Sequence, residues 1–416
     1  MMNPTKEQRP DADEAVREFY ERLPYPRPID SLEKYQRLWQ DVGRRRADFH
    51  LHWPAARYRD DLSILVAGCG TSQAAKHAMR WPEAQVTGID FSATSVHCTE
   101  ALKKKYKLDN LQLHQLPVER AGELGASFDQ IVCTGVLHHL PDPDAGLRAL
   151  HDVLEPDGAL HVMVYAPYGR AGVYLLQDYC RRLGIGTSSQ EIKDLAVSLK
   201  ALPPDHPLIP LLRNAPDFRT EAALADALLH PQDCAYSVPQ LFNFLAAGGF
   251  RFGRWVRQAA YLPQCGALAS TPHQTLLTRL PAEEQYAAVE LFRGSMVRHS
   301  AVAYRNDRPN HGSINFTGDA WLGYVPIPLP DTICVQEKLP PGAAGVLINR
   351  SHTYTDIYLP INAQQKNLYD AVDGKRSIGE IAPETALRNI ARVLFEGLWH
   401  YDQVVFDASR HLKQAG

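Results

Sequence analysis

The stretch that most constrains the fold of this chain is residues 64–90, ILVAGCGTSQAAKHAMRWPEAQVTGID. An apolar run typical of a buried strand leads into a tight turn at Gly68 and Gly70. A helix is expected over 71–80, followed by a second strand over 85–89 that ends on Asp90. A carboxylate at the tip of the second strand, 20 residues past Gly70, suits a sugar diol held beside a glycine-rich turn. The alternative is an ordinary strand–helix–strand crossover whose turn binds nothing.

Strand and helix patterns alternate from residue 62 to residue 166. Short strands separated by helical stretches imply parallel strand–helix–strand units with helices on both faces of the sheet. We therefore predict an α/β fold, a Rossmann-like doubly wound sheet within residues 61–310. The strand candidates are 62–67, 85–89, 111–114, 128–133 and 159–165, and the helices between them include 92–107 and 143–154.

Two helical additions flank or interrupt this pattern. Residues 1–60 predict an N-terminal helical arm, broken at 23–28 because the prolines of LPYPRP forbid a continuous helix. Residues 167–236 are rich in Leu, Ala and Pro and are too long for a connecting loop, so we interpret them as an inserted helical cap. The α/β pattern then resumes with a helix at 238–250 and a last strand at 299–307.

A polar, proline-rich linker is expected at 308–330, followed by a small α+β domain at 331–416. That domain carries two helices around the turn VDGKRS (372–377) and a terminal strand in VVFDAS. At 416 residues the chain is too long for one typical core, which agrees with more than one folding unit.

Composition is that of a soluble globular protein, 45% hydrophobic and 22% charged. The net charge of −3 gives no reason to expect a nucleic-acid partner, and the basic run at 44–46 is read as a solvated helix face. Seven cysteines without a C-x-x-C pair disfavour disulfides and structural zinc. The polar start MMNPTKEQRPDADE lacks a secretory pattern, and no apolar run approaches the roughly eighteen residues that span a bilayer. A cytoplasmic location without membrane association is expected.

The glycine turn is an anion site in principle, because backbone N–H groups at a helix N-terminus bind negative charge. The anion could be a pyrophosphate or a carboxylate. A dinucleotide fingerprint would need a glycine at position 73, where the chain has Gln73. A smaller cofactor with one carboxylate therefore fits better.

Two further segments carry the argument onward. FDQIVCTGVLHHLPDP (128–143) is a buried strand running into a small-residue turn, two histidines and a proline stop. LEPDGALHVMVYAPYGR (154–170) places a turn at 156–158 before a strand that ends in Tyr165. With G-C-G-T and G-I-D-x-S upstream, the chain resembles the class I S-adenosylmethionine-dependent methyltransferases, closely over 60–165 and more loosely over 238–307. The resemblance implies a seven-stranded sheet that ends in an antiparallel hairpin, a methyl-transfer activity, and S-adenosyl-L-methionine as cofactor with S-adenosyl-L-homocysteine as product.

The resemblance also implies which residues hold the cofactor. Asp90 would accept hydrogen bonds from the ribose hydroxyls, Phe91 would lie along the adenine, and Leu116 would present a backbone N–H to the adenine edge. The turn residues would approach the methionine part, and the residues after the fourth strand would lie near the sulfonium. These two groups are Gly68, Cys69 and Gly70, and Thr134, Gly135 and Val136.

The chain departs from the family pattern where the family often has an acidic residue, a third glycine and an acidic adenine neighbour. Here those positions are Val66, Ser72 and Gln115. Each loss removes a polar contact to the cofactor, so we expect the N-terminal arm to help, with Tyr20, Tyr25 and Arg27 closing over the cofactor. For Tyr20 the competing interpretation is packing on a helix face, and for 24–26 it is a structural break.

Methyl transfer from a sulfonium mainly requires alignment, desolvation and, for some acceptors, deprotonation. No metal is required, and no ligand cluster is visible in the sequence. His138 or His139 has a suitable intrinsic pKa for a base, but adjacent helical residues point about 100° apart, so one of them at most faces the site. The resemblance implies that His139 is often structural. Tyr165, Tyr168 and Arg170 are candidates to hold an acceptor carboxylate or phosphate, with contacts to the cap as the alternative.

Three functional interpretations remain. The first is a methyltransferase for a small-molecule acceptor under the helical cap. The second has a peptide or protein acceptor docked by 331–416, a segment loosely similar to PqqD-like peptide-recognition domains and winged-helix modules through its D-G-x-x-[ST]-I-x-E-I-A pattern. That segment could equally serve packing or homodimer formation. The third, from a different class, is a module that binds the cofactor without catalysis. A nicotinamide-dependent dehydrogenase is a remote fourth, since Asp90 would suit that ribose as well.

Overall fold

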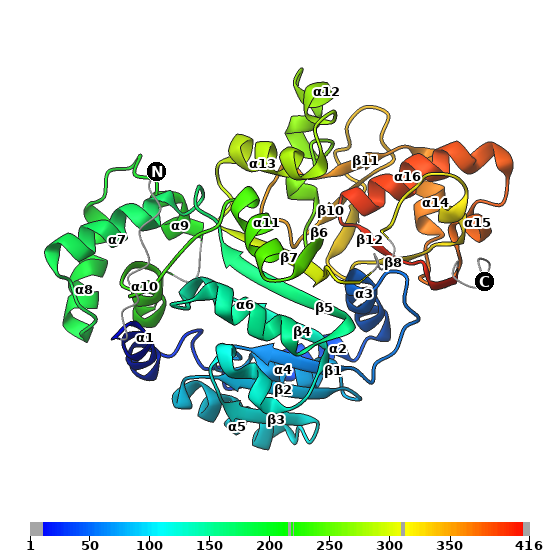
Figure 1. Cartoon of the computed structure of the whole chain (residues 1–416). Helices are drawn as coiled ribbons and strands as arrows, with labels where there is room; N and C mark the ends of the chain where they lie inside the picture. Colours follow the sequence, from blue (N-terminus) through cyan, green and yellow to red (C-terminus); the bar gives the residue numbers. More distant parts are fainter. Residues whose placement is uncertain (1–10, 215–217, 219, 309–312, 411–416) are drawn as a thin grey trace. The chain divides into compact units, whose positions relative to one another are not determined.

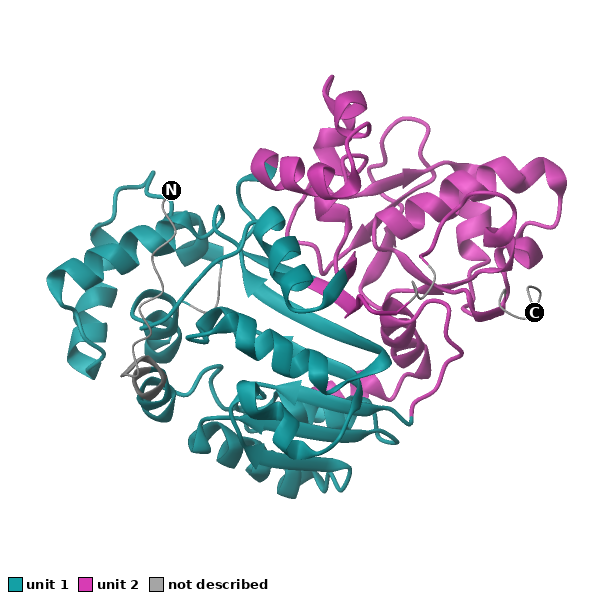
Figure 2. Ribbon diagram, in the orientation of Figure 1, with its two compact units in different colours: residues 1–33, 61–251, 293–300 teal, residues 34–60, 252–292, 301–416 magenta. Residues whose placement is uncertain are grey.

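The computed structural model describes residues 11–214, 218, 220–308 and 313–410 (Figure 1). The polar start at 1–10 and part of the predicted linker, 309–312, lie outside this range. Two compact units are present (Figure 2). Unit 1 contains residues 1–33, 61–251 and 293–300, and unit 2 contains 34–60, 252–292 and 301–416. The predicted arm at 1–60 is thus divided between the units. Its expected end at residue 60 coincides with a unit boundary, and the C-terminal domain expected at 331–416 lies within unit 2, which has no boundary at 331.

A seven-stranded sheet with the strand order β3-β2-β1-β4-β5-β7-β6 confirms the predicted Rossmann-like α/β class. The strands are β1 (Ser63–Ala67), β2 (Gln85–Asp90), β3 (Leu111–Gln115), β4 (Phe128–Thr134), β5 (Leu154–Tyr165), β6 (Phe250–Trp255) and β7 (Arg298–Arg305). The first five are paired in parallel, with β1 between β2 and β4. The apolar runs of the central strands β1 and β4 are buried, as expected of a parallel sheet covered by helices, whereas in the edge strand β3 only Leu111 is buried.

The strand β5 begins earlier than the sequence indicated. Leu154 pairs with Phe128, whereas Ala159 pairs with Gln130, so the residues between them bulge out of the ladder. The predicted turn at 156–158 is therefore real, but it is a bulge within a strand.

Helices cover the sheet in two groups. In the first, α4 (Gln73–Arg80) packs beside α5 (Ala93–Tyr106), and in the second, α6 (Pro143–Asp152) packs beside α11 (Val238–Ala247). The helix α5 begins at the Ser92 side chain, which accepts the Ser95 N–H, and ends at Lys107 in a left-handed conformation. The helix predicted at 71–80 begins two residues later, at Gln73, because the glycine turn extends to Ser72.

The arm is helical with the predicted break. The helix α1 (Asp11–Arg22) lies in unit 1, while α2 (Glu33–Trp39) and α3 (Val42–His52) fall almost entirely in unit 2. The Asp41 side chain caps α3 by accepting the Gly43 N–H.

The segment predicted as a cap is helical, with α7 (Ala171–Leu183), α8 (Ser189–Ser198), α9 (Ile209–Asn214) and α10 (Glu221–Leu228). Its apolar side chains form a cluster of their own, which includes Val173, Ile192 and Leu224. Phe19 of α1 is a member of the same cluster. The cap and the first helix of the arm therefore share one hydrophobic core.

Unit 2 contains two small sheets and several helices. Its strands are β8 (Val325–Pro328) paired with β12 (Val404–Asp407), and β9 (Thr332–Val335), β10 (Gly345–Asn349) and β11 (Leu359–Ile361) in the order β11-β10-β9. Its helices include α12 (Gln274–Leu277), α13 (Ala282–Arg293, which ends at the unit boundary), α14 (Ala363–Asp370), α15 (Ile378–Ile381) and α16 (Arg388–His400). The two helices around 372–377 and the terminal strand are confirmed.

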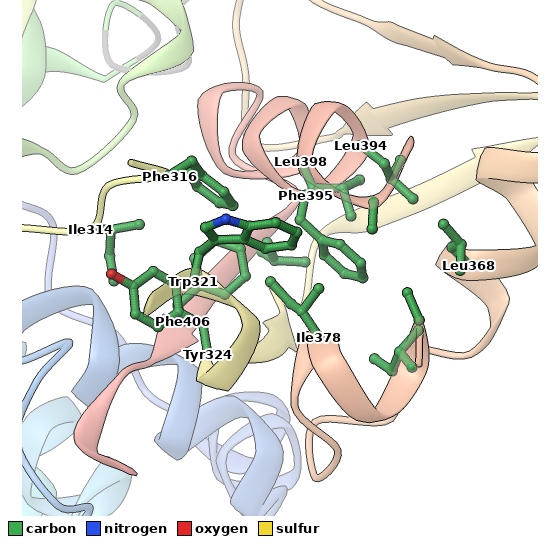
Figure 3. Packing of buried hydrophobic residues seen from close by; sticks show 14 of the residues in the cluster. Ile314, Phe316, Trp321, Tyr324, Leu368, Ile378, Leu394, Phe395, Leu398 and Phe406 are labelled. Carbon is green, nitrogen blue, oxygen red and sulfur yellow. The ribbon is translucent and has the colours of Figure 1, made fainter. Parts of the chain in front are cut away.

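The segment predicted as a linker belongs to the core of unit 2 instead. Phe316, Trp321 and Tyr324 are at most 6% exposed and pack with Phe395 and Phe406 (Figure 3). The linker prediction was wrong because polar and proline residues separate these aromatic side chains along the chain. Such spacing hides the fact that one side of the segment is apolar.

None of the helices in the described ranges is both long and apolar enough to cross a bilayer.

Candidate functional site

Three loops meet where the strand order reverses, beside the carboxyl end of β1. They follow β1, β2 and β4, and in doubly wound sheets this switch point is where ligands bind. Gly68 and Gly70 adopt φ of +69° and +53°, which a residue with a side chain rarely tolerates. A Cβ on Gly68 would lie 2.2 Å from the Val136 side chain, so the turn after β1 packs directly against the loop after β4.

Asp90 links the turn to the end of β2. One carboxylate oxygen accepts the Gly70 N–H at 2.8 Å, and the other accepts the Ser92 N–H at 3.0 Å. Burial raises the pKa of Asp90 to about 6, although these two hydrogen bonds lower it. The carboxylate therefore has free lone pairs and an incompletely compensated charge. A ribose diol would supply the missing donors, so this site fits the sugar of an adenosine-type cofactor.

Phe91 and Leu116 flank Asp90 as predicted, but one expected role changes. The Leu116 N–H donates to the Asp90 carbonyl at 2.9 Å, which extends the pairing of β2 with β3. It is therefore already engaged within the protein, and the expectation that it is presented to an adenine is wrong. Gln115 is held in the same loop, where its side-chain amide donates to the Phe91 carbonyl at 3.3 Å.

The remaining predicted cofactor residues line the same junction. Cys69 is fully buried, its N–H donates to the Ile89 carbonyl at 2.9 Å, and burial raises the pKa of its thiol well above the usual range. Thr134 ends β4, opposite Met163 of β5. Gly135 follows at φ +80° and donates its N–H to the Met163 carbonyl at 3.2 Å. The turn after β1 and the loop after β4 are thus both fixed by glycines at positive φ and by backbone hydrogen bonds.

The N-terminal arm lies over the glycine turn. Thr71 donates its hydroxyl to the Pro26 carbonyl at 2.7 Å, and a Cβ on Gly70 would lie 3.5 Å from the Pro26 ring. Glu21 accepts the Ala93 N–H at 2.6 Å at the start of α5. The arm is therefore positioned by polar contacts to two of the loops that form the site.

Tyr20 connects the arm to the cap. Its hydroxyl donates to Asp226 of α10 at 2.9 Å, and its ring meets the Phe91 ring edge-on at 6.1 Å. The contact with Phe91 agrees with a position beside the expected adenine. The competing interpretation, packing on a helix face, is also partly right, since the ring lies 5.3 Å from that of Phe19.

The two histidines after β4 differ sharply in environment. His138 is fully buried and neither of its ring nitrogens has a partner among the described residues. Burial holds its pKa well below the ordinary value, so the ring is neutral. Its ring centre lies 4.0 Å from that of the Tyr165 ring, with the two planes tilted by 40°. His139 instead has a hydrogen-bond partner, the Gln232 carbonyl, 2.8 Å from its Nδ1.

Arg170 is not free to hold an acceptor anion. Its guanidinium lies 3.6 Å from the centre of the Tyr165 ring and pairs with Asp233 at 3.1 Å. Tyr174 accepts a further hydrogen bond from it at 3.2 Å. Tyr168, the third predicted anion contact, is 42% exposed. The contact with the cap segment, the alternative interpretation, describes Arg170 better.

Sequence reasoning missed two buried polar residues of the cap, Asp226 and His230. One nitrogen of His230, one of His139 and a carboxylate oxygen of Asp226 all lie within 4.8 Å of one another. Asp226 lies in α10 and His230 follows that helix, both within a run of mostly small and apolar residues. The appearance of these two polar side chains in such a run was the available signal.

This geometry defines a class: a Rossmann-like domain with an adenosine-type cofactor site at the switch point and a polar, buried cluster beside it. Residues 65–160 match the family model described as a methyltransferase domain. Residues 65–160 are thus a methyltransferase domain, as the motifs of this segment predicted.

Parts of the chain are similar to known proteins. The Synechococcus protein named syc1184_c is 34% identical over 197 residues, which cover 45% of this chain and 47% of that protein. A ubiquinone biosynthesis O-methyltransferase of Albidiferax ferrireducens is 33% identical over 96 residues, 23% of this chain and 38% of that enzyme. The chain thus spans less than half the length of these curated relatives. The structure of PKMT2 from Rickettsia typhi has a similar fold, with a TM-score of 0.61 and 16% identity over 90% of this chain and 74% of that one.

Proposed function

We propose that this protein transfers a methyl group from S-adenosylmethionine to a small-molecule acceptor. The observation that carries the proposal is the Asp90 carboxylate, held under the glycine turn at the switch point of a sheet whose segment 65–160 matches the methyltransferase family model. PKMT2, whose fold is similar, was solved in complex with AdoHcy, the product of this cofactor.

Enclosure supports a small acceptor. The groups on the far side of the cofactor loops, His138, His139 and Asp226, are at most 5% exposed. A compact molecule can enter such a site when the arm or the cap opens, whereas a surface segment of a folded protein would have to unfold to reach it. Burial also removes water from the reacting groups, which strengthens every polar interaction among them.

The bound sulfonium supplies an activated methyl group, so the protein needs to hold, orient and desolvate the acceptor. Asp90 would hold the ribose, and Phe91 and Tyr20 would flank the adenine. The packed glycine turn would fix the cofactor's position relative to the loop after β4. His138, whose ring is neutral and makes no hydrogen bond to the residues that the structure describes, would line the acceptor side together with Tyr165.

Calorimetry with S-adenosylhomocysteine on the intact protein tests the cofactor part of the proposal. We expect saturable binding with one site per chain. Absence of binding would reject both a methyltransferase and a cofactor-binding module. Competition with a nicotinamide dinucleotide in the same experiment checks the dehydrogenase alternative, for which the nucleotide would displace the bound ligand.

A peptide or protein acceptor is the second candidate, because the D-G-x-x-[ST]-I-x-E-I-A pattern in 331–416 is loosely similar to that of PqqD-like peptide-recognition domains. Deleting 331–416 would remove β12 from its partner β8 and expose the core of unit 2, so it is not a clean test. Incubating the intact protein with cofactor carrying a radioactive methyl group and a cell extract is better. Label in the low-molecular-weight fraction supports a small acceptor, and label in the protein fraction supports the second candidate.

Binding of the product without any label transfer would instead indicate a cofactor-binding module. A homodimer and a cytoplasmic location remain our predictions for the whole protein.

A further inference from the structure

A buried polar cluster of His139, Asp226 and His230 lies at the junction of the cap with the loop after β4. His139 ends the short helix Leu137–His139, Asp226 lies in α10, and His230 follows that helix. The three side chains are at most 8% exposed. Their polar atoms lie within 4.8 Å of one another, yet no hydrogen bond or ion pair joins Asp226 to either imidazole in the part of the chain that the structure describes.

The backbone of one residue, Gln232, sets the tautomers of both histidines, in opposite senses. The Gln232 carbonyl lies 2.8 Å from Nδ1 of His139, and a carbonyl can only accept, so this nitrogen carries the proton and Nε2 keeps a lone pair. The Gln232 N–H donates to Nδ1 of His230 at 3.0 Å. The neutral His230 ring must then carry its proton on Nε2, which is buried and has no partner among the described residues.

The tautomer of His230 disfavours a metal ion at this cluster. The three polar atoms lie within 4.8 Å of one another, a limit that both a tetrahedral zinc ion and a shared hydrogen-bonded oxygen satisfy. His230, however, could offer Nε2 to a metal only by moving its proton to Nδ1, where the Gln232 N–H already donates.

We propose that this cluster binds the hydroxyl group that is methylated, so that the acceptor is an alcohol, phenol or enol. This inference rests on the proposed function and adds its substrate class. His230 donates through Nε2–H to one lone pair of the acceptor oxygen, and His139 accepts the hydroxyl proton at Nε2. Asp226, with one oxygen occupied by the Tyr20 hydroxyl, lies beside both rings and stabilises the positive charge that His139 acquires.

A hydroxyl matches this set of donors and acceptors better than an amine. An oxygen has two lone pairs, so one can accept from His230 while the other attacks the methyl carbon. A neutral amine has a single lone pair, which cannot do both, and an ammonium group has none. The pairing with His230 therefore orients a hydroxyl for attack and blocks an amine.

The reaction balances without a further reactant. The acceptor oxygen forms the new bond to the methyl carbon, and the carbon–sulfur bond breaks with its electron pair on sulfur. The hydroxyl proton goes to Nε2 of His139. The products are a methyl ether, neutral S-adenosylhomocysteine and an imidazolium that later releases its proton to solvent.

Nitrogen-15 NMR of the histidine rings in the intact protein tests the tautomers without any activity measurement. We expect His139 protonated on Nδ1 and His230 on Nε2. Phenol and benzylammonium then serve as size-matched probes added to the protein with S-adenosylhomocysteine present. Phenol should shift the ring signals of both histidines, and benzylammonium should not.

The variant His230→Leu, whose side chain has no N–H donor, should weaken phenol binding about tenfold, as expected for loss of one buried hydrogen bond. Its affinity for S-adenosylhomocysteine reports separately on the cofactor site and on folding. If this variant does not fold, the tautomers and the probe shifts of the unmodified protein still test the proposal. Opposite tautomers, equal shifts with benzylammonium, no shift with phenol, or stoichiometric Zn²⁺ binding that His230→Leu abolishes would each overturn the proposal. Failure of S-adenosylhomocysteine to bind would instead reject the proposed function.

Discussion

Replacing Asp90 by Asn is the sharpest test of the cofactor site. The substitution keeps the shape of the side chain and removes its charge. In the protein the carboxylate accepts two backbone N–H groups but is otherwise buried, and burial raises its pKa to about 6. If ribose hydroxyls donate to this group, the ionised form is the one that binds, and binding must be coupled to loss of a proton wherever Asp90 is protonated.

The magnitudes follow from that pKa. A carboxyl pKa raised from 3.8 to about 6 means that ionised Asp90 costs stability above pH 6, on the order of 3 kcal/mol, and that this cost disappears as the pH falls toward 4. Ligand donors offset part of the cost. Between pH 7 and pH 5 the ionised fraction in the free protein falls about tenfold, so the affinity for S-adenosylhomocysteine should fall about tenfold. At pH 7 the Asn variant should bind about 10- to 150-fold more weakly, since a hydrogen bond to a charged group contributes about 1.5–3 kcal/mol.

Calorimetry at pH 7, 6 and 5, in pairs of buffers with different ionisation heats, measures both the affinity and the proton release. Asp90→Asn should lose the pH dependence as well as the affinity. Asp109→Asn, at an exposed position before β3, is the matched control and should behave like the unmodified protein. Equal affinities for Asp90→Asn and the unmodified protein, or a pH-independent affinity of the unmodified protein, would refute the placement of the ribose at Asp90.

Three further predictions concern stability, each measured by urea unfolding. Gly68→Ala should lower the free energy of unfolding by about 2–4 kcal/mol, because φ at this position is positive and the added methyl group would overlap the Val136 side chain. Adding Val136→Ala should restore part of that stability. If it restores none, this overlap is not the cause of the loss. Glu21→Gln should cost about 0.5–1 kcal/mol at pH 7, because the carboxylate caps α5. Hydrogen bonds, chiefly from a threonine hydroxyl, lower the pKa of Glu21, so this difference should disappear as the pH falls through that lowered pKa, and a difference that persists in acid would contradict the capping role. Trp321→Ala should lower the free energy of unfolding by about 3–5 kcal/mol, whereas Phe292→Ala, at an exposed position, should lower it by less than about 0.5 kcal/mol. If both variants lost equally little stability, residues 313–330 would be a linker, as the sequence predicted.

The sheet could be predicted from the sequence because its information is local. Each parallel strand is an apolar run bounded by turn residues, and each helix has its own start and stop signals, so most bounds were found to within two residues. The linker prediction at 308–330 was wrong for the opposite reason. Its aromatic residues are spaced irregularly, and only their common contact with α16 and β12 reveals them as core.

The candidate site divides in the same way. Gly68, Gly70 and Asp90 lie at strand ends, where position in the sheet follows from position in the sequence. Asp226 and His230 come from a cap whose helices reach the loop after β4 only through tertiary packing. No strand end marks them, and the appearance of two polar residues in a run of mostly small and apolar residues was the available signal.

Because the two halves of the site are built differently, mutations can separate cofactor binding from acceptor binding. The cofactor half is built from loops joined by short-range backbone contacts, whereas the acceptor half depends on the cap, which shares its core with α1. Tyr20 belongs to both halves, since it meets Phe91 with its ring and Asp226 with its hydroxyl. Tyr20→Phe should therefore leave the ring contact intact and alter acceptor binding more than cofactor binding, whereas Tyr20→Ala should weaken both. If the two variants weakened S-adenosylhomocysteine binding equally, the hydroxyl would belong to the cofactor half, and Asp226 would have to be assigned there with it.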